Sequence, residues 1–469
     1  MSRFIMLALS ILMSGSSFAL TLDQYLDQVK QQNLSLQSSE QRREGSALLR
    51  READLIFTPK FFLNGQKGYD SRLPNPPFLV FDQVRTDKIS TGISQEFSFG
   101  LESRFSYDLV KTEYKGIQFA PGIDNPYWDA IPTLELTIPL WGNAFGRASK
   151  ARRELSLQQR TFEARSAEAQ AKRTLVEAEV AYWRLAALQE SVSVQRKALD
   201  AAQNIYEYVT NKKRKNLGEE ADVLQARALT QSYQLQLEQA LIDERAARRR
   251  FNLFLNVDAS APVDQLAPLD SSSLVSAPVP TFRPGDRPDV RASLAQVALA
   301  EATARLSSEQ NKPTLNLYGG YAFFGRDGKQ ADAISRAGYA DRETAYFGVR
   351  FQMPLNVMAM SDAREGASLT QKAAELNHRY LVYSQEQEWT DLSQLYKDSQ
   401  TTLKMTEMLE KAQKAKLDNE RVRLRQGRTT TYQVLLFEQD YLASEIARIR
   451  AATQIINLNS QFKLYSSND

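Results

Sequence analysis

The chain has 469 residues, with 59 Lys or Arg against 56 Asp or Glu and a formal net charge of +3. This near balance argues against a dedicated nucleic-acid-binding protein, which usually has a clear basic excess. With no cysteine and one histidine, His378, the chain offers no disulfide, no thiolate site and little support for a histidine metal site or catalytic triad.

Residues 1–19 predict a secretory signal peptide that is cleaved before Leu20. Arg3 supplies a positive start, the apolar run after it is too short to span a bilayer, and Ser17 and Ala19 are the small residues of a cleavage site. A buried N-terminal helix is the alternative. No other apolar run approaches 18 residues, and the mean hydropathy of −0.45 excludes a bundle of membrane helices. This low mean hydropathy does not exclude membrane β-strands, because such strands are recognised by the alternation of apolar and polar residues.

The mature chain is predicted to begin with one helix over residues 21–56, where good helix formers occur without proline. Pro59 ends this helix. A weak alternation over 61–69 indicates a strand, and three prolines mark 70–88 as a loop.

The clearest strand signal runs from Ile89 to Leu109, where apolar residues share one parity and polar residues the other. One strand of that length would be about 70 Å long, whereas a membrane strand needs about 9–11 residues. A hairpin that turns near Gly100 is therefore predicted. A loop over 112–130 and a further alternating strand over 134–140 follow, and both loops beside the hairpin are expected outside the cell.

A long helical hairpin is predicted after these strands. Residues 148–214 contain neither proline nor glycine, and apolar residues recur there at coiled-coil spacing. At 1.5 Å per residue this helix is about 100 Å long. Gly218 breaks it, and a return helix over 219–255 follows. No compact globular domain accommodates such a hairpin, so it must project.

The second half repeats this order. A Pro- and Ser-rich linker leads to a helix, two strands separated by a glycine-rich loop, a long helix, a break at Gly427 and a return helix. The linker covers 257–288, and the later elements cover 290–309, 315–323, 345–353, 361–424 and 431–463.

Short motifs support an internal repeat. Pro59-Lys60-Phe61-Phe62-Leu63 matches Pro313-Thr314-Leu315-Asn316-Leu317, and Ile138-Pro139-Leu140 matches Met353-Pro354-Leu355. The break at Gly218 with Val223-Leu224 is matched to Gly427 with Val434-Leu435. We therefore divide the chain into the signal peptide 1–19, a first repeat 20–256, a linker 257–288 and a second repeat 289–469.

Outward apolar strands need lipid, and in lipid their edges must be closed. Four to six strands per chain are too few to enclose a lumen, so strands must be pooled across subunits. The predicted object is an α+β membrane protein: an oligomeric barrel in the outer membrane, continued by a helical tunnel in the periplasm.

The repeat, the Pro-opened strands, Asn33-Leu34-Ser35-Leu36 and the two helix breaks resemble the TolC family of outer-membrane efflux proteins. This resemblance covers essentially the whole mature chain. It implies a homotrimer with a shared 12-stranded barrel, and a duct for efflux or type I secretion. It also implies an adaptor protein and an inner-membrane pump as partners. Because the sequence offers no catalytic or cofactor-binding motif, we predict no cofactor and no enzyme activity.

The resemblance places the adaptor contacts at the helix breaks, and three-fold symmetry would gather the nearby side chains around an aperture. The docking candidates are Asn216, Leu217, Gly218, Val223, Leu224, Gln426, Gly427, Val434 and Leu435. The aperture candidates are Arg425, Arg428 and Gln433.

The chain departs from the family in three respects. Its first half has room for four strands rather than two, which leaves open an 18-stranded trimer or a hairpin outside the wall. Two acidic positions after the second break are occupied here by Gln433 and Leu436. The first break is also two residues shorter between its glycine and Leu224 than the second break between Gly427 and Leu435.

The remaining candidates have ordinary interpretations. His378 is predicted to be a surface or packing residue, and Arg248–Arg250 a solvated helix face. The basic run 212–215 is either a helix end that suits the dipole or part of the functional tip. A soluble periplasmic coiled-coil adaptor or structural protein is the alternative function. An enzyme is the third hypothesis, but the sequence shows no phosphate loop, dinucleotide fingerprint, nucleophile elbow or HExxH motif.

Overall fold

The computed structural model describes residues 20–72, 81–117, 119–269, 274–275, 277–280, 282–339 and 342–466. The predicted signal peptide, 1–19, lies outside these residues. The chain divides into two bodies. The helical body comprises 1–41, 167–288 and 382–469, and the strand body comprises 42–166 and 289–381.

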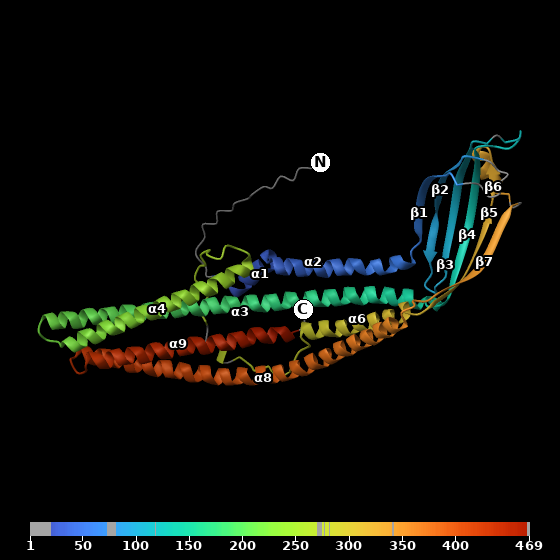
Figure 1. The fold of residues 1–469 in the computed structure, drawn as a ribbon. Helices are drawn as coiled ribbons and strands as arrows, with labels where there is room; N and C mark the ends of the chain where they lie inside the picture. Colours follow the sequence, from blue (N-terminus) through green and yellow to red (C-terminus); the bar gives the residue numbers. More distant parts are fainter. Residues whose placement is uncertain are drawn as a thin grey trace. The chain divides into compact units, whose positions relative to one another are not determined.

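The strand body is built on one antiparallel sheet (Figure 1), in which six strands pair in the order β1-β2-β3-β4-β5-β7 and a short seventh strand, β6, pairs with β4. Five of these pairings join neighbours along the path, and each of them is antiparallel. The bounds are β1 Lys60–Asp70, β2 Gln83–Glu96, β3 Glu102–Lys115, β4 Tyr127–Trp141, β5 Thr314–Phe323, β6 Gly325–Asp327 and β7 Glu343–Gln352.

The hairpin predicted between Ile89 and Leu109 is confirmed, and it turns where Gly100 has φ +97°. Its strands are longer than predicted, so the loops expected over 70–88 and 112–130 shrink; residues 73–80 lie outside the described residues. The loop predicted over 325–343 contains β6 and the short helix α7, Gln330–Arg336. Helix α7 packs through Ala333 and Ala337 on Ala130 of β4, a tertiary contact that local periodicity does not encode.

The register gives the sheet one apolar and one polar face. The apolar face consists of exposed side chains that share one side of the pleat: Phe61, Leu63, Ile89, Ile93, Phe105, Leu134, Leu136, Ile138, Leu317, Tyr321, Phe347, Val349 and Phe351. On the polar face, Asp108 accepts hydrogen bonds from Ser90 at 2.5 Å and Lys88 at 2.7 Å. The Tyr346 hydroxyl donates to Glu135 at 2.6 Å on the same face.

The N-terminal segment forms three helical pieces instead of the single predicted helix: α1 Leu22–Gln32, α2 Leu34–Leu49 and a 3-10 helix, η1, Arg50–Phe57. The break lies at Asn33, whose backbone is extended (φ −71°, ψ 115°). The Asn33 side chain accepts from the Leu36 amide at 3.0 Å and donates to the Phe254 carbonyl at 2.8 Å. Asparagine competes in this way with the helical backbone, so good helix formers on both sides do not join.

Within the strand body, four helical segments join the sheet at the same end. Residues 42–57 lead into β1, and β4 leads through the 3-10 turn η2, Ala144–Gly146, into the start of α3. Helix α6, Pro288–Gln310, leads into β5, and β7 leads into the start of α8. The opposite end of the sheet carries the β1–β2 and β3–β4 connections together with α7.

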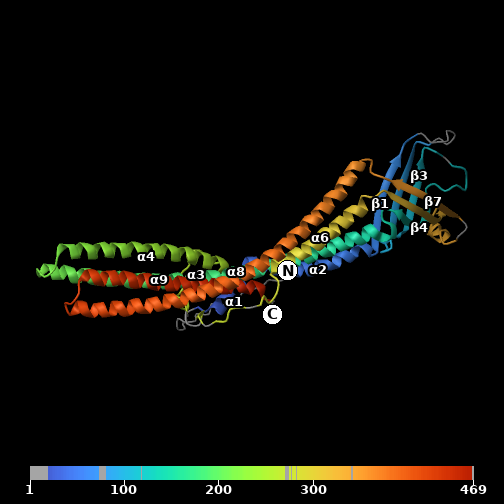
Figure 2. The same ribbon diagram turned by 90° about the horizontal axis from the view of Figure 1, so that it is seen from below.

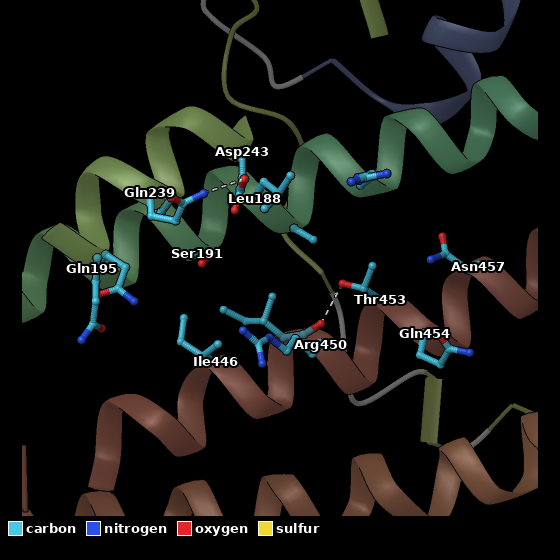
Figure 3. A pocket seen from close by; sticks show the side chains of 15 residues that line it. Leu188, Ser191, Gln195, Gln239, Asp243, Ile446, Arg450, Thr453, Gln454 and Asn457 are labelled. Atoms are coloured by element: carbon cyan, nitrogen blue, oxygen red, sulfur yellow. Dashed lines mark hydrogen bonds between the residues drawn. The ribbon is translucent and has the colours of Figure 1, made fainter. Parts of the chain in front are cut away.

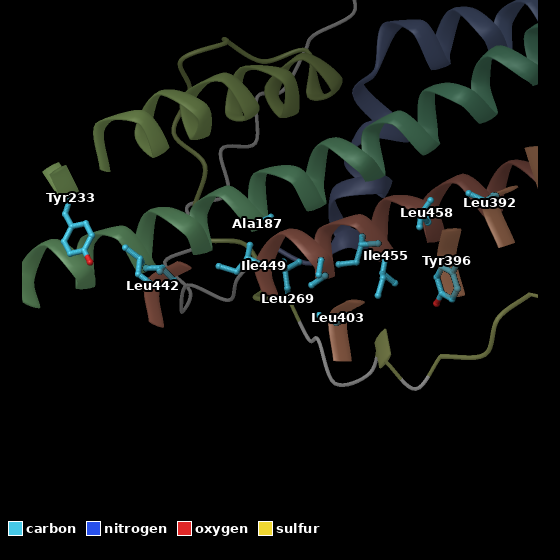
Figure 4. Packing of buried hydrophobic residues seen from close by; sticks show 14 of the residues in the cluster. Ala187, Tyr233, Leu269, Leu392, Tyr396, Leu403, Leu442, Ile449, Ile455 and Leu458 are labelled. Carbon is cyan, nitrogen blue, oxygen red and sulfur yellow. The ribbon is translucent and has the colours of Figure 1, made fainter. Parts of the chain in front are cut away.

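The helical body contains two antiparallel hairpins, α3–α4 and α8–α9, which run side by side in both views (Figures 1 and 2). Their helices are α3 Arg147–Arg214, α4 Glu220–Leu255, α8 Val357–Arg425 and α9 Thr431–Phe462. A shared apolar core joins all four helices (Figure 4), with Leu403 and Ile455 fully buried. The predicted coiled-coil spacing in α3 is confirmed, since Ala178, Tyr182 and Leu185 are all fully buried.

The predicted linker, 257–288, is pinned to the helical body where it is described. Gln189 of α3 accepts from the Leu266 amide at 2.9 Å, and Gln400 of α8 donates to the Ala277 carbonyl at 2.7 Å. Leu266 and Leu269 enter the two apolar cores of this body. Across the described ranges, no helix combines the length and apolarity needed to cross a bilayer.

Candidate docking and aperture site at the helical turns

Both helical hairpins end in the same Schellman turn. At the end of α3 the Leu217 amide donates to the Lys212 carbonyl at 3.0 Å, and the Asn216 amide to the Lys213 carbonyl at 2.8 Å. At the end of α8 the Arg428 amide donates to Arg423 at 2.9 Å, and the Gly427 amide to Leu424 at 3.0 Å. This pattern places Asn216 (φ +57°) and Gly427 (φ +70°) in the left-handed conformation that the motif requires.

The predicted match between Gly218 and Gly427 is therefore wrong: the residue that corresponds to Gly427 is Asn216. The starts of the two return helices support the alignment of Asn216 with Gly427. Their N-caps, Glu219 and Thr430, have nearly identical backbone angles (φ −95°, ψ 152° and φ −94°, ψ 154°). The two-residue length difference between the breaks disappears with this alignment. Asparagine tolerates the left-handed region because its short polar side chain can hydrogen-bond locally.

The structure separates the predicted apolar docking residues into two groups. Leu217 and Leu224 at the first turn are 66% and 56% exposed. At the second turn Val434 and Leu435 are both buried. Leu435 belongs to the core that joins the hairpins, and Val223 packs against that core. Tyr432 and Leu436 are exposed apolar side chains of the second turn, and neither was among the predicted docking residues.

The polar candidates remain at the surface. Asn216, Arg425, Gln426, Gly427 and Arg428 are exposed, while Gly218 and Gln433 are half-buried. The Gln433 amide donates to the N-cap hydroxyl of Thr430 at 3.3 Å, which places this residue in the first turn of α9.

Acidic side chains at the second turn are held inside the hairpin. Glu420, which is buried, accepts from Arg423 at 3.1 Å and from the Thr429 hydroxyl. Glu438, also buried, accepts from Arg421 at 2.5 Å. The surface of this turn therefore presents arginines.

The first turn is of mixed charge, with a basic run on one side. Lys213 pairs with Glu220, while Glu219 and Asp222 begin α4. Within the described residues, no ion pair engages the other three members of the basic run, Lys212, Arg214 and Lys215.

Away from the turns, a charged cluster joins three helices of the helical body. Arg448 of α9 contacts Glu410 of α8 at 2.6 Å and Glu190 of α3 at 2.8 Å, and its side chain is 15% exposed. Burial, followed by the charge of Glu410, raises the pKa of the Glu445 carboxyl. Burial and the carboxylates of Glu445 and Glu410 likewise raise the pKa of the Tyr441 hydroxyl to about 12. The cluster thus holds more carboxylates than its single arginine can pair.

A polar groove of about 560 Å³ runs between the two hairpins, lined by α3, α4 and α9 (Figure 3). The side-chain oxygens of Gln195 and Asn457 line it, are buried and have no hydrogen-bond partner in the described residues. On α4, Gln239 donates to Asp243 at 3.2 Å. Buried amides without partners are uncommon in folded proteins and suit a ligand or partner that completes their hydrogen bonds.

A polar pattern in the sequence indicates this groove, whereas the apolar periodicity does not. Polar residues recur every three or four positions along each of its helices, as in Arg450, Thr453 and Asn457 of α9. The single histidine, by contrast, lies where predicted: His378 packs in the strand body with its Nδ1 2.8 Å from the Ser293 hydroxyl.

No family model matches the sequence, and no curated protein matches it. The structure is similar to those of several solved outer-membrane proteins. It matches the outer-membrane channel OprN with a TM-score of 0.68 at 18% identity, over 95% of this chain and 90% of that one. It matches CusC, whose structures concern transmembrane channel formation, with a TM-score of 0.69 at 14% identity, over 96% of this chain and 94% of that one.

A third match is the open state of the MtrE outer-membrane channel of Neisseria gonorrhoeae, with a TM-score of 0.66 at 16% identity, over 96% of this chain and 89% of that one. The likeness is one of fold, and it extends over nearly the whole of each chain. The predicted resemblance is thereby confirmed: this chain has the TolC-like fold of outer-membrane channels.

Proposed function

We propose that the protein is the passive outer-membrane exit duct of a tripartite efflux or type I secretion system. Its strands lie in the outer membrane and its helices extend into the periplasm. The observation that carries this proposal is the exposed apolar face, of which one cross-strand row stays apolar on all six strands of a sheet whose fold resembles that of outer-membrane channels. A large exposed apolar surface on a sheet needs lipid or a partner to cover it.

Closure of the sheet requires further copies of the chain. The sheet path ends at β1 and β7, so each of these strands presents an edge of backbone N–H and C=O groups. In lipid such groups must be hydrogen-bonded, and β1 of one copy can pair antiparallel with β7 of the next. The resemblance supports a homotrimer as the closed assembly.

The polar groove and the helical turns support an adaptor as the periplasmic partner, with an inner-membrane pump behind it. Exposed Leu217, Leu224 and Tyr432 offer apolar anchors at the turns, and the unpartnered amides of Gln195 and Asn457 offer hydrogen bonds in the groove. Partner helices that lie along the hairpins would meet both. The two-repeat division of the chain at 257–288 belongs to the same proposal.

The alternative of a soluble periplasmic adaptor is disfavoured by the exposed apolar face, because a soluble protein would bury it. We propose a conduit rather than an enzyme, since the solved structures with this fold are channels.

Fractionation and native mass spectrometry test the assignment. We expect the mature chain in the outer-membrane fraction, released only by detergent, with Leu20 as its first residue and a mass of three chains. The apolar face gives the reason for the detergent requirement. A protein recovered as a monomer from the soluble periplasmic fraction would instead support the soluble alternative.

The arginines of the second turn provide a test of the aperture. We expect Arg425→Glu with Arg428→Glu to lower anion preference and to change single-channel conductance in planar bilayers, because three symmetry-related pairs would reverse from cationic to anionic around one axis. Arg245→Glu with Arg249→Glu makes the same charge change on exposed positions of α4 and is the matched control. If ion selectivity and conductance match the parent channel in both variants, the arginines lie away from the aperture.

A further inference from the structure

The sheet holds more strands per chain than the 12-stranded trimer implied by the resemblance would need. Twelve strands require four from each of three chains, whereas six strands here form one continuous path. The two extra strands are β2 and β3, which form a hairpin between β1 and β4. The hairpin either belongs to the barrel wall or folds away from it.

The pairing register places the hairpin in the wall. Strand β1 pairs with β2 along its whole length, from Lys60↔Ser94 to Asp70↔Val84, and β3 pairs with β4 from Glu102↔Thr137 to Thr112↔Tyr127. No direct pairing joins β1 to β4 in the described sheet. A hairpin outside the wall would require β1 and β4 to pair with each other instead.

Side-chain chemistry is continuous through the hairpin as well. One cross-strand row consists of Phe61, Ile93, Phe105, Leu134, Tyr321 and Ala345, and it stays apolar across all six strands. The next row, on the opposite face, consists of Lys60, Ser94, Arg104, Glu135, Gly320 and Tyr346. A hairpin in water outside the barrel has no reason to continue an apolar row on one face and a polar row on the other.

Beyond Ile89 and Leu109 the apolar rows of the hairpin give way to charged residues. On the same face, Asp87 pairs with Lys67 of β1 at 3.6 Å, and Lys111 lies over the Trp128 ring at 5.7 Å. Charged pairs and a tryptophan at this level are typical of the boundary between hydrocarbon and water.

We infer that β2 and β3 are lipid-facing wall strands, so that three chains close a barrel of 18 strands with a widened lumen. This inference rests on the proposed duct function. With strands about 4.8 Å apart and tilted by about 40°, the backbone diameter is about 36 Å for 18 strands and about 24 Å for 12. Side chains occupy about 5 Å on each side of the lumen, which leaves an inner diameter of about 26 Å for 18 strands and about 14 Å for 12 strands.

The 12-stranded and the 18-stranded barrels would admit cargo of different sizes. A lumen of about 14 Å admits at most a single α-helix, whose diameter is about 10–12 Å. A lumen of about 26 Å admits a folded polypeptide of about 50 residues. The sheet section of this duct therefore sets no small-molecule limit on what leaves the cell.

Single cysteines test the inference, since the chain has none of its own. Adjacent positions are substituted in β2 (Ile93→Cys and Ser94→Cys), in β3 (Phe105→Cys and Arg104→Cys) and, as the control, in β7 (Val349→Cys and Arg350→Cys). We expect a membrane-impermeant thiol reagent to label Ser94→Cys, Arg104→Cys and Arg350→Cys in reconstituted trimers. A lipid-soluble maleimide should label the three apolar positions instead.

The control separates the inference from the function on which it rests. If labelling alternates in β7 but the impermeant reagent also labels Ile93→Cys and Phe105→Cys, the hairpin lies outside the wall. This result overturns the inference and leaves the proposed function intact. If the labelling of Val349→Cys and Arg350→Cys in β7 does not alternate either, both the proposed function and the inference are overturned. An electron-microscopy cross-section of the unsubstituted protein in a nanodisc provides a second measurement, in which 18 strands are expected and 12 would refute the wide barrel.

Discussion

Valine at both left-handed positions, Asn216→Val with Gly427→Val, will abolish export while leaving the amount and membrane location of the protein unchanged. Both residues have positive φ, which costs a residue with a Cβ about 1–2 kcal/mol, and a β-branched residue tolerates it least. The strain is relieved when the backbone of each turn changes conformation, which displaces Leu217 from the proposed docking surface and the second-turn arginines from the proposed aperture. Export of a dye from whole cells measures the effect.

Gly218→Ala is the matched control for this pair. Gly218 lacks positive φ, and an added Cβ would meet the Lys213 nitrogen at 3.2 Å, a contact that a small shift relieves. An added Cβ at Gly427 meets nothing within 4 Å, so its sensitivity comes from the backbone and not from crowding. We expect near-normal export from Gly218→Ala. Normal export from the double valine variant would remove the turns from the mechanism.

Arg448→Leu will cost the folded protein about 3–5 kcal/mol, because it leaves Glu190 and Glu410 without their shared cationic partner. The residue ties α9 to both α3 and α8, so the loss falls on the contact between the two hairpins. Thermal unfolding in detergent measures it. Arg450→Leu, two residues away on the same helix and exposed, is the control and is expected to change stability by less than about 0.5 kcal/mol.

The effect of Arg448→Leu will depend on pH in a defined direction. The pKa of Glu445 is raised in the folded protein, so the folded state binds more protons than the unfolded state between the unfolded and folded pKa values. Stability therefore rises as pH falls through that window. Removal of the arginine strengthens the repulsion among the carboxylates, so the variant should recover stability on mild acidification more than the parent does. An identical pH profile for both proteins would show that the cluster is not electrostatically coupled.

Periodicity along the chain predicted the long elements because burial and backbone geometry act locally in them. The 3.6-residue spacing in α3 buries Tyr182 and Leu185, and the alternation from Ile89 to Leu109 produces the β2–β3 hairpin. The N-terminal helix was predicted wrongly as one piece because Asn33 interacts with the Phe254 carbonyl, more than 200 residues away in the chain. Helix α7 was missed for a related reason, since Ala130 of β4 stabilises it.

The two helical turns lie where the sequence predicted them, but their backbone and side-chain details differ. Glycine pointed to both turns, yet the left-handed residue of the first turn is Asn216, because either residue type accepts that conformation. Val434 and Leu435 were predicted on the docking surface, but the structure buries both, and Leu435 lies in the core between the hairpins. The groove that contains Gln195 and Asn457 draws on α3, α4 and α9, so no segment of the sequence shows it alone.

By itself, the sequence determined the long helices and strands, because each depends on the spacing of apolar residues within about 70 residues of chain. Matches between distant segments predicted the internal repeat, and the two together gave the resemblance to outer-membrane channels. Only the tertiary structure decided that β2 and β3 continue the sheet between β1 and β4, and that Asn216 corresponds to Gly427. Alternation states which side chains share a face of one strand, but not which strand lies beside it. Strand neighbours depend on hydrogen bonds between distant segments, and a turn depends on backbone angles that more than one residue type can adopt.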